Sequence, residues 1–529
     1  MTTYQRIFGC CIILILLLPT LFFPLGADHF TFLRGGELVV NGGRMYVDYY
    51  DVKPPLIFYM FGIVGNILGF NELALRSFDL FWQVCTAFSL VIVVSRLVQN
   101  QILGFCCGAM YALSYTSLNF TETLQCEGFA GIGIIWLIYF QISSKNTHSI
   151  SRYIVQGVAL GWITALKFPL GILFFAIIIE DLLSRQLTKK KLLTKWTIIV
   201  IGMIFTMSVL LAAYFDSEVL SGYRRISVYL AFYASNPPVN FDFIRTSIKS
   251  IAEFFGDNYS LALMACIAGT IFSMFSEELL RRFHQLRSKK LILFSILVSA
   301  LLLLSVVIER KLLPYRFSRM YIPLSILSGI GVVILYQEWW KKIPSNAKNL
   351  KLLASMIVFF IVIFSPLPRW LNVARFGCNS IIGNTYTNSI SVQNSDPVSS
   401  PRVDVMEVTR YIKSQPIQGK TFAISTVASF VYYFLDEKPI SKFISPTMYY
   451  SIIAPKGMKS EMQQEVKQAT WLIVQTNDRH PSMYGHSNSS SEMLASDSIV
   501  SGYVQKNFIH CSTIGVFKIY KKNTIAAIH

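Results

Sequence analysis

The sequence predicts an α-helical polytopic membrane protein that carries an α/β domain at its C-terminal end. Hydrophobic residues make up 53% of the chain and charged residues only 14%, and the mean hydropathy is +0.49. A soluble chain would carry nearer 25% charged residues. The apolar residues come in runs of roughly 18 or more, the length that crosses a hydrocarbon core of about 30 Å. After about residue 368 these runs shrink to strand length and polar residues become frequent.

The hydrophobic runs predict about eleven membrane spans. The first run is long for the apolar core of a signal peptide, and no small-residue cleavage site follows it, so we expect it to remain as a span. The run 56–70 is short and glycine-containing, and we expect it to lie along the membrane interface instead of crossing. The predicted spans cover residues 7–25, 76–98, 101–118, 124–143, 153–166, 169–183, 196–214, 256–275, 291–308, 319–337 and 351–367.

The basic residues of the loops predict the orientation of these spans. With run 56–70 outside the membrane, the loops richest in Lys and Arg fall on one side, which the positive-inside rule places in the cytoplasm. The cluster Lys189, Lys190 and Lys191 is the clearest case. The N-terminus is then cytoplasmic and the region after 368 is extracytoplasmic. The net charge of +18 is largely explained by such loops and does not indicate nucleic-acid binding.

A second set of charged residues lies on the predicted outer face. Lys and Arg on that face run against the orientation rule, and an anionic ligand such as a phosphate would account for them. The loop after the first span is the densest part of the set, and we take it as the candidate active site. The set comprises Asp28, Glu37, Asp48, Asp51, Lys53, Glu122, Glu127, Lys167, Arg224, Arg225, Lys311, Arg316 and Arg319.

The polar region at the end of the chain predicts one small α/β domain, because about 160 residues suffice for it. Apolar stretches at 421–426, 471–476 and 515–521 are typical of buried strands, and 403–413 has the pattern of an amphipathic helix. We therefore expect a transmembrane domain over 1–367, with the active-site loop at 26–75, and a soluble domain over 368–529. Cys378 and Cys511 could form a disulfide if this domain faces an oxidising compartment.

The loop after the first span resembles a segment of the GT-C class of membrane glycosyltransferases. The resemblance is to the bacterial aminoarabinose transferases and to relatives of the dolichyl-phosphate-mannose–protein mannosyltransferases, and it lies in Gly43, Tyr46, Asp48, Asp51, Lys53, Pro54, Pro55 and Leu56. Members also carry an acidic residue at the outer end of the first span, which is Asp28 here. Shorter matches are Gly69 to Arg76 with Glu72, an acidic residue at Glu127 or Glu122, Gly161 to Lys167, and Lys311 to Tyr315 with Pro323.

This chain departs from the family pattern at two positions. His29 follows Asp28 where many relatives have a second acidic residue, and the later acidic residue is Glu instead of Asp. No second His or Cys stands near His29 at the spacing of a metal site. We therefore assign no metal ligand, and the use of a divalent metal stays open.

The resemblance implies an enzyme of a bacterial inner membrane that moves a sugar from a polyprenyl-phosphate carrier to an extracytoplasmic acceptor, with inversion at the anomeric carbon. Asp28 is then expected to act as general base and Lys53 to stabilise the leaving phosphate. Asp48 and Asp51 are also expected to form turns or to orient Lys53 or Arg44. Substrate contacts are expected from Lys53, Tyr46, Asp48, Asp51, Glu127, Lys167, Lys311, Tyr315, Arg316 and Arg319. Neither the sugar nor the acceptor, be it a glycolipid, a glycan or a protein, can be read from these residues.

Some of these residues also fit simpler roles, and the layout fits two further functions. Asp28 could be a helix cap, Lys53 an interfacial anchor and Glu127 a polar group satisfied inside the bundle. A flippase or transporter of lipid-linked glycans would need ionisable residues deep in the spans, where this chain has few besides Asp79. An oligosaccharide ligase or polymerase would share the layout but use a pyrophosphate-linked glycan.

Overall fold

A computed structural model of the chain describes residues 2–118, 120–143, 149–184, 187–235, 241–254, 286–310, 312–335, 371, 401–417, 419–444, 447–451, 454, 457–479 and 487–523. The chain divides into two compact units. The helical unit consists of Met1–Phe23, Arg76–Ala212 and Val239–Gly377, and the mixed unit consists of Pro24–Leu75, Ala213–Pro238 and Cys378–His529. The loop after the first predicted span thus groups with the C-terminal region. The expected boundary at 367/368, as well as Cys378, lies outside the described residues.

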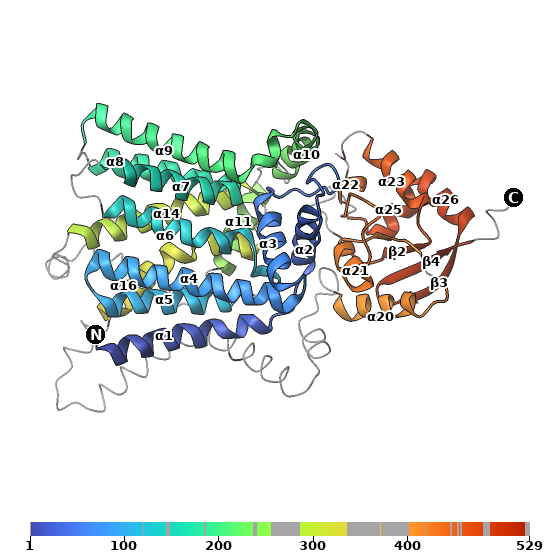
Figure 1. Ribbon diagram of the computed structural model, residues 1–529, viewed down its shortest axis with the longest axis horizontal. Coiled ribbons are helices and arrows are strands. Elements are labelled where there is room, and N and C mark those ends of the chain that lie inside the picture. Colours follow the sequence, from blue (N-terminus) through green and yellow to red (C-terminus); the bar gives the residue numbers. More distant parts are fainter. Residues whose placement is uncertain are drawn as a thin grey trace. The chain divides into compact units, whose positions relative to one another are not determined.

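The helical unit is built from apolar helices that run side by side (Figure 1). Several of them are linked by short 3-10 turns. Its helices are α1 (Thr3–Leu17), η1 (Leu18–Phe22), α4 (Glu72–Val98), α5 (Gln101–Thr116), η2 (Phe120–Glu122), α6 (Cys126–Ile142), α7 (Ile150–Leu166), η3 (Phe168–Ile172), α8 (Leu173–Ser184), α9 (Lys189–Leu210), α11 (Phe241–Glu253), α14 (Leu286–Ile308), α15 (Pro314–Phe317), η6 (Ser318–Met320) and α16 (Tyr321–Leu335). The short helix η4 (Ala212–Phe215) follows α9 at the limit between the units.

Four helices of the described residues are long and apolar enough to cross a membrane: Thr3–Phe22, Glu72–Val98, Lys189–Leu210 and Lys289–Ile308. The apolar helices Leu56–Leu68, Cys126–Ile142 and Ile150–Leu166 are shorter. The membrane character of the chain is therefore clear, while the total of eleven spans stays a prediction. The predicted spans 256–275 and 351–367 lie outside the part of the chain that the structure describes.

Polar contacts at the two ends of the helical unit agree with the predicted alternation of the spans. At one end, the start of α6 meets the ends of α7 and α14 through Glu127, Lys167 and Glu309. At the other end, Gln141 near the end of α6 meets Asp181 of α8 and Lys195 near the start of α9. Neighbouring helices thus run in opposite directions. Which end faces the cytoplasm stays a prediction.

The mixed unit contains a four-stranded sheet in the order β1-β2-β4-β3, in which β1 and β2 are parallel and the other pairs antiparallel. Figure 1 labels β2, β4 and β3 of this sheet. The strands are β1 (Thr421–Ile424), β2 (Trp471–Gln475), β3 (Phe508–Ile514) and β4 (Phe517–Lys522). β1, β2 and β4 match the predicted strands, and β3 was not predicted. The helices are α2 (Ala27–Val40), α3 (Leu56–Leu68), α10 (Ser217–Ser235), α20 (Arg402–Lys413), α21 (Ala428–Leu435), α22 (Thr447–Tyr450), α23 (Met458–Lys467), α25 (Ser490–Ser496) and α26 (Ser498–Asn507).

Candidate active site

Asp28 lies in the first turn of α2, at the start of the candidate active-site loop. A carboxylate is favoured there by the helix dipole. The backbone N–H of Gly26 donates to Nδ1 of the buried His29 at 2.9 Å, so the imidazole caps the helix end. This use of Nδ1 gives His29 a structural role. Among the described residues no group of three or more His, Cys, Asp or Glu side chains is placed to hold a metal ion.

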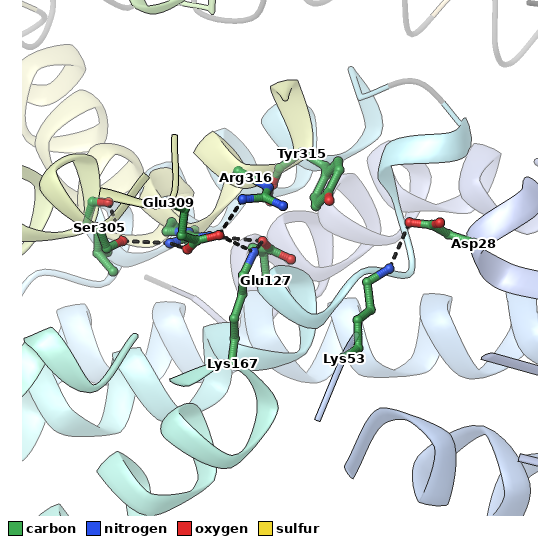
Figure 2. Close-up of polar contacts among 11 residues, drawn as sticks. Asp28, Lys53, Glu127, Lys167, Ser305, Glu309, Tyr315 and Arg316 are labelled. Atoms are coloured by element: carbon green, nitrogen blue, oxygen red, sulfur yellow. Dashed lines mark hydrogen bonds and ion pairs between the residues drawn. The ribbon is translucent and has the colours of Figure 1, made fainter. Parts of the chain in front are cut away.

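Asp28 and Lys53 form an ion pair (Figure 2). Lys53 Nζ lies 2.8 Å from Asp28 Oδ2 and 4.1 Å from the centre of the Phe32 ring. The Lys53 side chain is 20% exposed and the Asp28 side chain 50%. The structure therefore brings together the two residues to which the sequence analysis gave the main chemical roles, and it leaves the carboxylate accessible.

The backbone around Lys53 is held by its neighbours in the loop. Asp51 Oδ1 accepts the N–H of Lys53 at 2.8 Å, and Tyr46 donates its hydroxyl to the carbonyl of Lys53 at 2.6 Å. Asp48 Oδ2 accepts the N–H of Arg44 at 2.8 Å. Asp48 and Asp51 thus hold the backbone of the loop at Arg44 and Lys53. Burial raises the pKa of Asp51 from 3.8 to about 6 although Lys53 opposes the shift.

Tyr46 joins this loop to α10, a contact that the sequence analysis did not predict. Its ring stacks on Tyr214 at 5.8 Å and meets Tyr223 edge-on at 5.3 Å. Gly222 allows this approach, because a Cβ atom there would lie 2.0 Å from the carbonyl oxygen of Tyr46. Tyr46 itself has a φ of 64°, an uncommon conformation for a residue other than glycine. Such strain persists when packing over-determines it.

The helical unit holds a second group of site residues, which we call the buried charge cluster: Glu127, Lys167, Glu309, Arg316 and Arg319. Four of them are buried and the Lys167 side chain is 16% exposed. Figure 2 shows Glu127, Lys167, Glu309 and Arg316. Glu127 pairs with Lys167 and lies 3.1 Å from Arg319. Glu309 binds Lys167 at 3.0 Å, Arg316 at 2.6 Å and Arg319 at 2.7 Å. The cluster thus joins two carboxylates and three cations through ion pairs. The net charge of these five groups is +1.

Two members of this region were missed by the sequence analysis. Glu309 bridges all three cations, and Ser305 accepts a hydrogen bond from Arg319 at 2.6 Å. The signal for Glu309 was its place at the end of a predicted span, directly before Arg310 and Lys311. Lys311 lies outside the described residues.

Other residues named from the sequence take different places. The Tyr315 ring lies 5.8 Å from both Lys167 Nζ and the Arg316 guanidinium carbon, while Glu122 lies in η2. Asp79 accepts hydrogen bonds from Tyr115 at 2.7 Å and Gln83 at 3.0 Å, so its carboxylate is hydrogen-bonded inside the helical unit.

The chain is similar to one protein-family model and to several solved structures. Residues 52–213 match the family model for dolichyl-phosphate-mannose-protein mannosyltransferase. The structure of ArnT from Cupriavidus metallidurans bound to undecaprenyl phosphate is similar, with a TM-score of 0.57 at 9% identity, covering 99% of each chain. The apo structure of the same protein has a TM-score of 0.58 at 10% identity, covering 99% of this chain and 98% of that chain. The Archaeoglobus fulgidus oligosaccharyltransferase tethered with an acceptor peptide has a TM-score of 0.51 at 10% identity, covering 99% of this chain and 75% of that.

No curated protein matches the chain in sequence. The similarity to solved structures is therefore one of fold, while the family model adds a sequence match that includes Lys53 and Glu127. The family-model match and the shared fold together confirm the predicted resemblance: the chain has the fold of the GT-C class of membrane glycosyltransferases.

Proposed function

We propose that the protein is an inverting glycosyltransferase of a bacterial inner membrane that takes a sugar from a polyprenyl-phosphate carrier. The observation that carries the proposal is the 2.8 Å ion pair between the half-exposed Asp28 and Lys53. It puts a base and a phosphate-binding cation side by side in the segment that resembles the family. The undecaprenyl phosphate bound to the structurally similar ArnT supports the choice of carrier.

In the proposed reaction Asp28 accepts the proton of an acceptor hydroxyl. The hydroxyl oxygen forms a bond to the anomeric carbon while the bond from that carbon to the phosphate oxygen breaks. The electron pair leaves with the polyprenyl phosphate, which is already anionic and needs a cation more than a proton. Lys53 supplies that cation. Because an ammonium group has three N–H donors, it can contact a carboxylate and a phosphate together.

We assign the buried charge cluster a role in binding the donor. Its cations Lys167, Arg316 and Arg319 exceed its carboxylates by one. An incoming phosphate would offset that excess, and guanidinium groups are well suited to phosphate oxygens. In this role Glu127 and Glu309 keep the cations in place and leave one positive charge unbalanced for the phosphate.

The test is Asp28→Asn in the purified full chain, supplied with polyprenyl-phosphate monosaccharides and envelope extract as acceptor. Release of free polyprenyl phosphate measures sugar transfer, whichever sugar the donor carries. Loss of a general base should reduce the rate by about 10²–10⁴-fold. Glu492→Gln is the control because it alters an exposed carboxylate that pairs with Arg479 and is not a site residue, and it should retain most activity. A fully active Asp28→Asn variant would refute the assignment.

A second candidate is an oligosaccharide transferase, favoured by the structural similarity to the archaeal oligosaccharyltransferase. It would use a glycan on a polyprenyl pyrophosphate. Supplying both donor types to the same preparation separates the two functions. Release of polyprenyl phosphate from the monosaccharide donor supports the first, and release of polyprenyl pyrophosphate from the glycan donor supports the second.

A further inference from the structure

Helix α2, which carries Asp28, is held along one side by α21 of the C-terminal α/β domain. The Phe30 ring stacks on Phe430 with centroids 4.4 Å apart. The hydroxyl groups of Thr31 and Ser429 lie 2.9 Å apart. Arg34 Nη2 donates to the carbonyl of Tyr432 at 2.9 Å, and Ser429 also donates to the carbonyl of Ala27 at 3.3 Å. The contacts thus extend over two turns of α2.

The helical period places these contacts on the face of α2 next to the one that carries the chemistry. Positions 27, 30, 31 and 34 share one side, while Asp28 and Phe32 share the adjacent side, where they contact Lys53. A helix with its side chains is about 10–12 Å across, so a rotation of about 10° would move the Asp28 carboxylate by about 1 Å. A displacement of this size can cost on the order of 100-fold in rate.

The entry to α2 is held by a second contact with the C-terminal domain. Arg402 of α20 binds Glu72 with both terminal nitrogens, at 3.0 and 2.5 Å. Glu72 Oε2 also accepts the N–H of Leu25, two residues before α2 begins, at 3.0 Å. Both charged side chains are largely buried, which strengthens such a bidentate pair relative to one on the surface. Glu72 belongs to the segment 69–76 that resembles the family but has no role in the proposed chemistry.

The loop that carries Lys53 is held by the same domain. The N–H of Tyr50 donates to the carbonyl of Lys442 at 2.8 Å, and the rings of Tyr50 and Phe443 lie 4.8 Å apart. Ser441 donates to Glu465 at 2.8 Å and supports this segment. The domain therefore contacts both α2, which carries Asp28, and the loop that carries Lys53. It does so through different segments.

We propose that the C-terminal α/β domain sets the position of Asp28, with Arg402 and Ser429 as positioning residues. The proposal rests on the proposed role of Asp28 as the base. Moving the base affects the chemical step, while Lys53 still binds the donor. The domain therefore governs kcat more than the KM for the donor.

The experiment compares Arg402→Met, Arg402→Lys and Ser429→Ala with the control Arg479→Met in the full chain. Arg479 forms an exposed pair with Glu492 at 2.5 Å in the same domain. Release of polyprenyl phosphate gives kcat and KM, and hydrogen exchange of residues 25–40 reports on α2. We expect Arg402→Met to lower kcat about 10–100-fold, with the donor KM changed less than about 3-fold and faster exchange in α2. Arg402→Lys should recover part of kcat, and Ser429→Ala should lower it several-fold.

Unchanged kcat in both Arg402→Met and Ser429→Ala would overturn the proposal, as would an equal loss of kcat in Arg479→Met. An increased KM at constant kcat would also overturn it, because that result belongs to donor binding. If the unmodified chain releases no polyprenyl phosphate from any donor, the proposed function fails instead. The exchange data then decide alone whether the domain holds α2: faster exchange in Arg402→Met but not in Arg479→Met supports the contact, and equal exchange refutes it.

Discussion

At the scale of single residues, the Asp28–Lys53 pair contributes little to folding. Its carboxylate is half exposed, and such pairs stabilise proteins by about 0–1 kcal/mol. The contact of the Lys53 ammonium group with the Phe32 ring is separate from its pair with Asp28. Substitutions at this pair should therefore alter chemistry or binding while the protein stays folded, which makes the two residues suitable for functional tests.

Lys53→Ala should weaken binding of undecaprenyl phosphate by about 10–100-fold, because hydrogen bonds to charged groups contribute about 1.5–3 kcal/mol. Lys53→Arg keeps the charge and should recover part of the affinity. Native mass spectrometry or a titration in detergent measures the binding. Equal affinity of the alanine variant and the unmodified protein would show that Lys53 does not contact the phosphate.

Asp51 predicts a specific pH dependence of stability. Its pKa rises from 3.8 to about 6 on folding because the carboxyl is buried. Between about pH 4 and pH 6 the folded state therefore binds more protons than the unfolded state, and the free energy of unfolding falls as the pH rises through this window. Above about pH 6 this contribution is constant. Asp51→Asn should remove this part of the slope of Tm against pH, whereas Asp48→Asn should keep it.

At the scale of elements, α2 and α3 depend on a close contact between two glycines. A Cβ atom at Gly36 would lie 2.5 Å from the backbone N of Gly62, and one at Gly62 would lie 2.7 Å from the carbonyl oxygen of Gly36. The backbone cannot give way as a flexible side chain would. This contact sets the distance between the helix that carries Asp28 and the helix that begins after Lys53.

Gly36→Ala should therefore destabilise the protein by about 1–3 kcal/mol through overpacking and reduce transfer, since it pushes α2 away from α3. Gly502 in α26 is the matched control, because a Cβ atom there meets nothing within 4 Å. Gly502→Ala should be neutral or stabilising by up to about 1 kcal/mol. Thermal unfolding in detergent compares the two, and equal Tm shifts would contradict the packing argument.

The parts of the site that the sequence predicted are local in the chain. Asp28 and Lys53 lie 25 positions apart in one loop with turn-forming residues between them, so a motif could identify both. Glu309 was missed because its role depends on α6, α7 and α14 meeting at one end, and hydrophobic periodicity does not encode such neighbours. For the same reason the contacts of Arg402 and Ser429 with the loop were not predicted, and β3, mostly exposed along its length, lacks the apolar run that identified β1 and β2.

At the scale of the whole molecule, charge is concentrated at the two ends of the helical unit. One end holds the buried charge cluster and the other holds Lys195, which binds Asp181 at 2.7 Å and Gln141 at 3.0 Å.

Removing one partner from such a buried group typically costs about 3–5 kcal/mol. Glu309→Gln leaves three cations with one carboxylate and should lower Tm clearly more than Glu492→Gln, which alters an exposed pair. Similar Tm values for the two variants would show that the cluster is hydrated.

The orientation of the molecule can be tested with cysteines placed at exposed lysines on the two predicted sides. Lys190 lies at the start of α9, in the loop that the positive-inside rule places in the cytoplasm, and Lys413 ends α20 in the C-terminal domain. In a background with Cys378→Ser and Cys511→Ser, Lys413→Cys should react with an impermeant maleimide in intact spheroplasts. Lys190→Cys should react only after permeabilisation. Asp28 belongs to α2, which packs against the C-terminal domain, so the reverse pattern would place Asp28 on the cytoplasmic side. A donor exposed on the outer leaflet could not then reach Asp28.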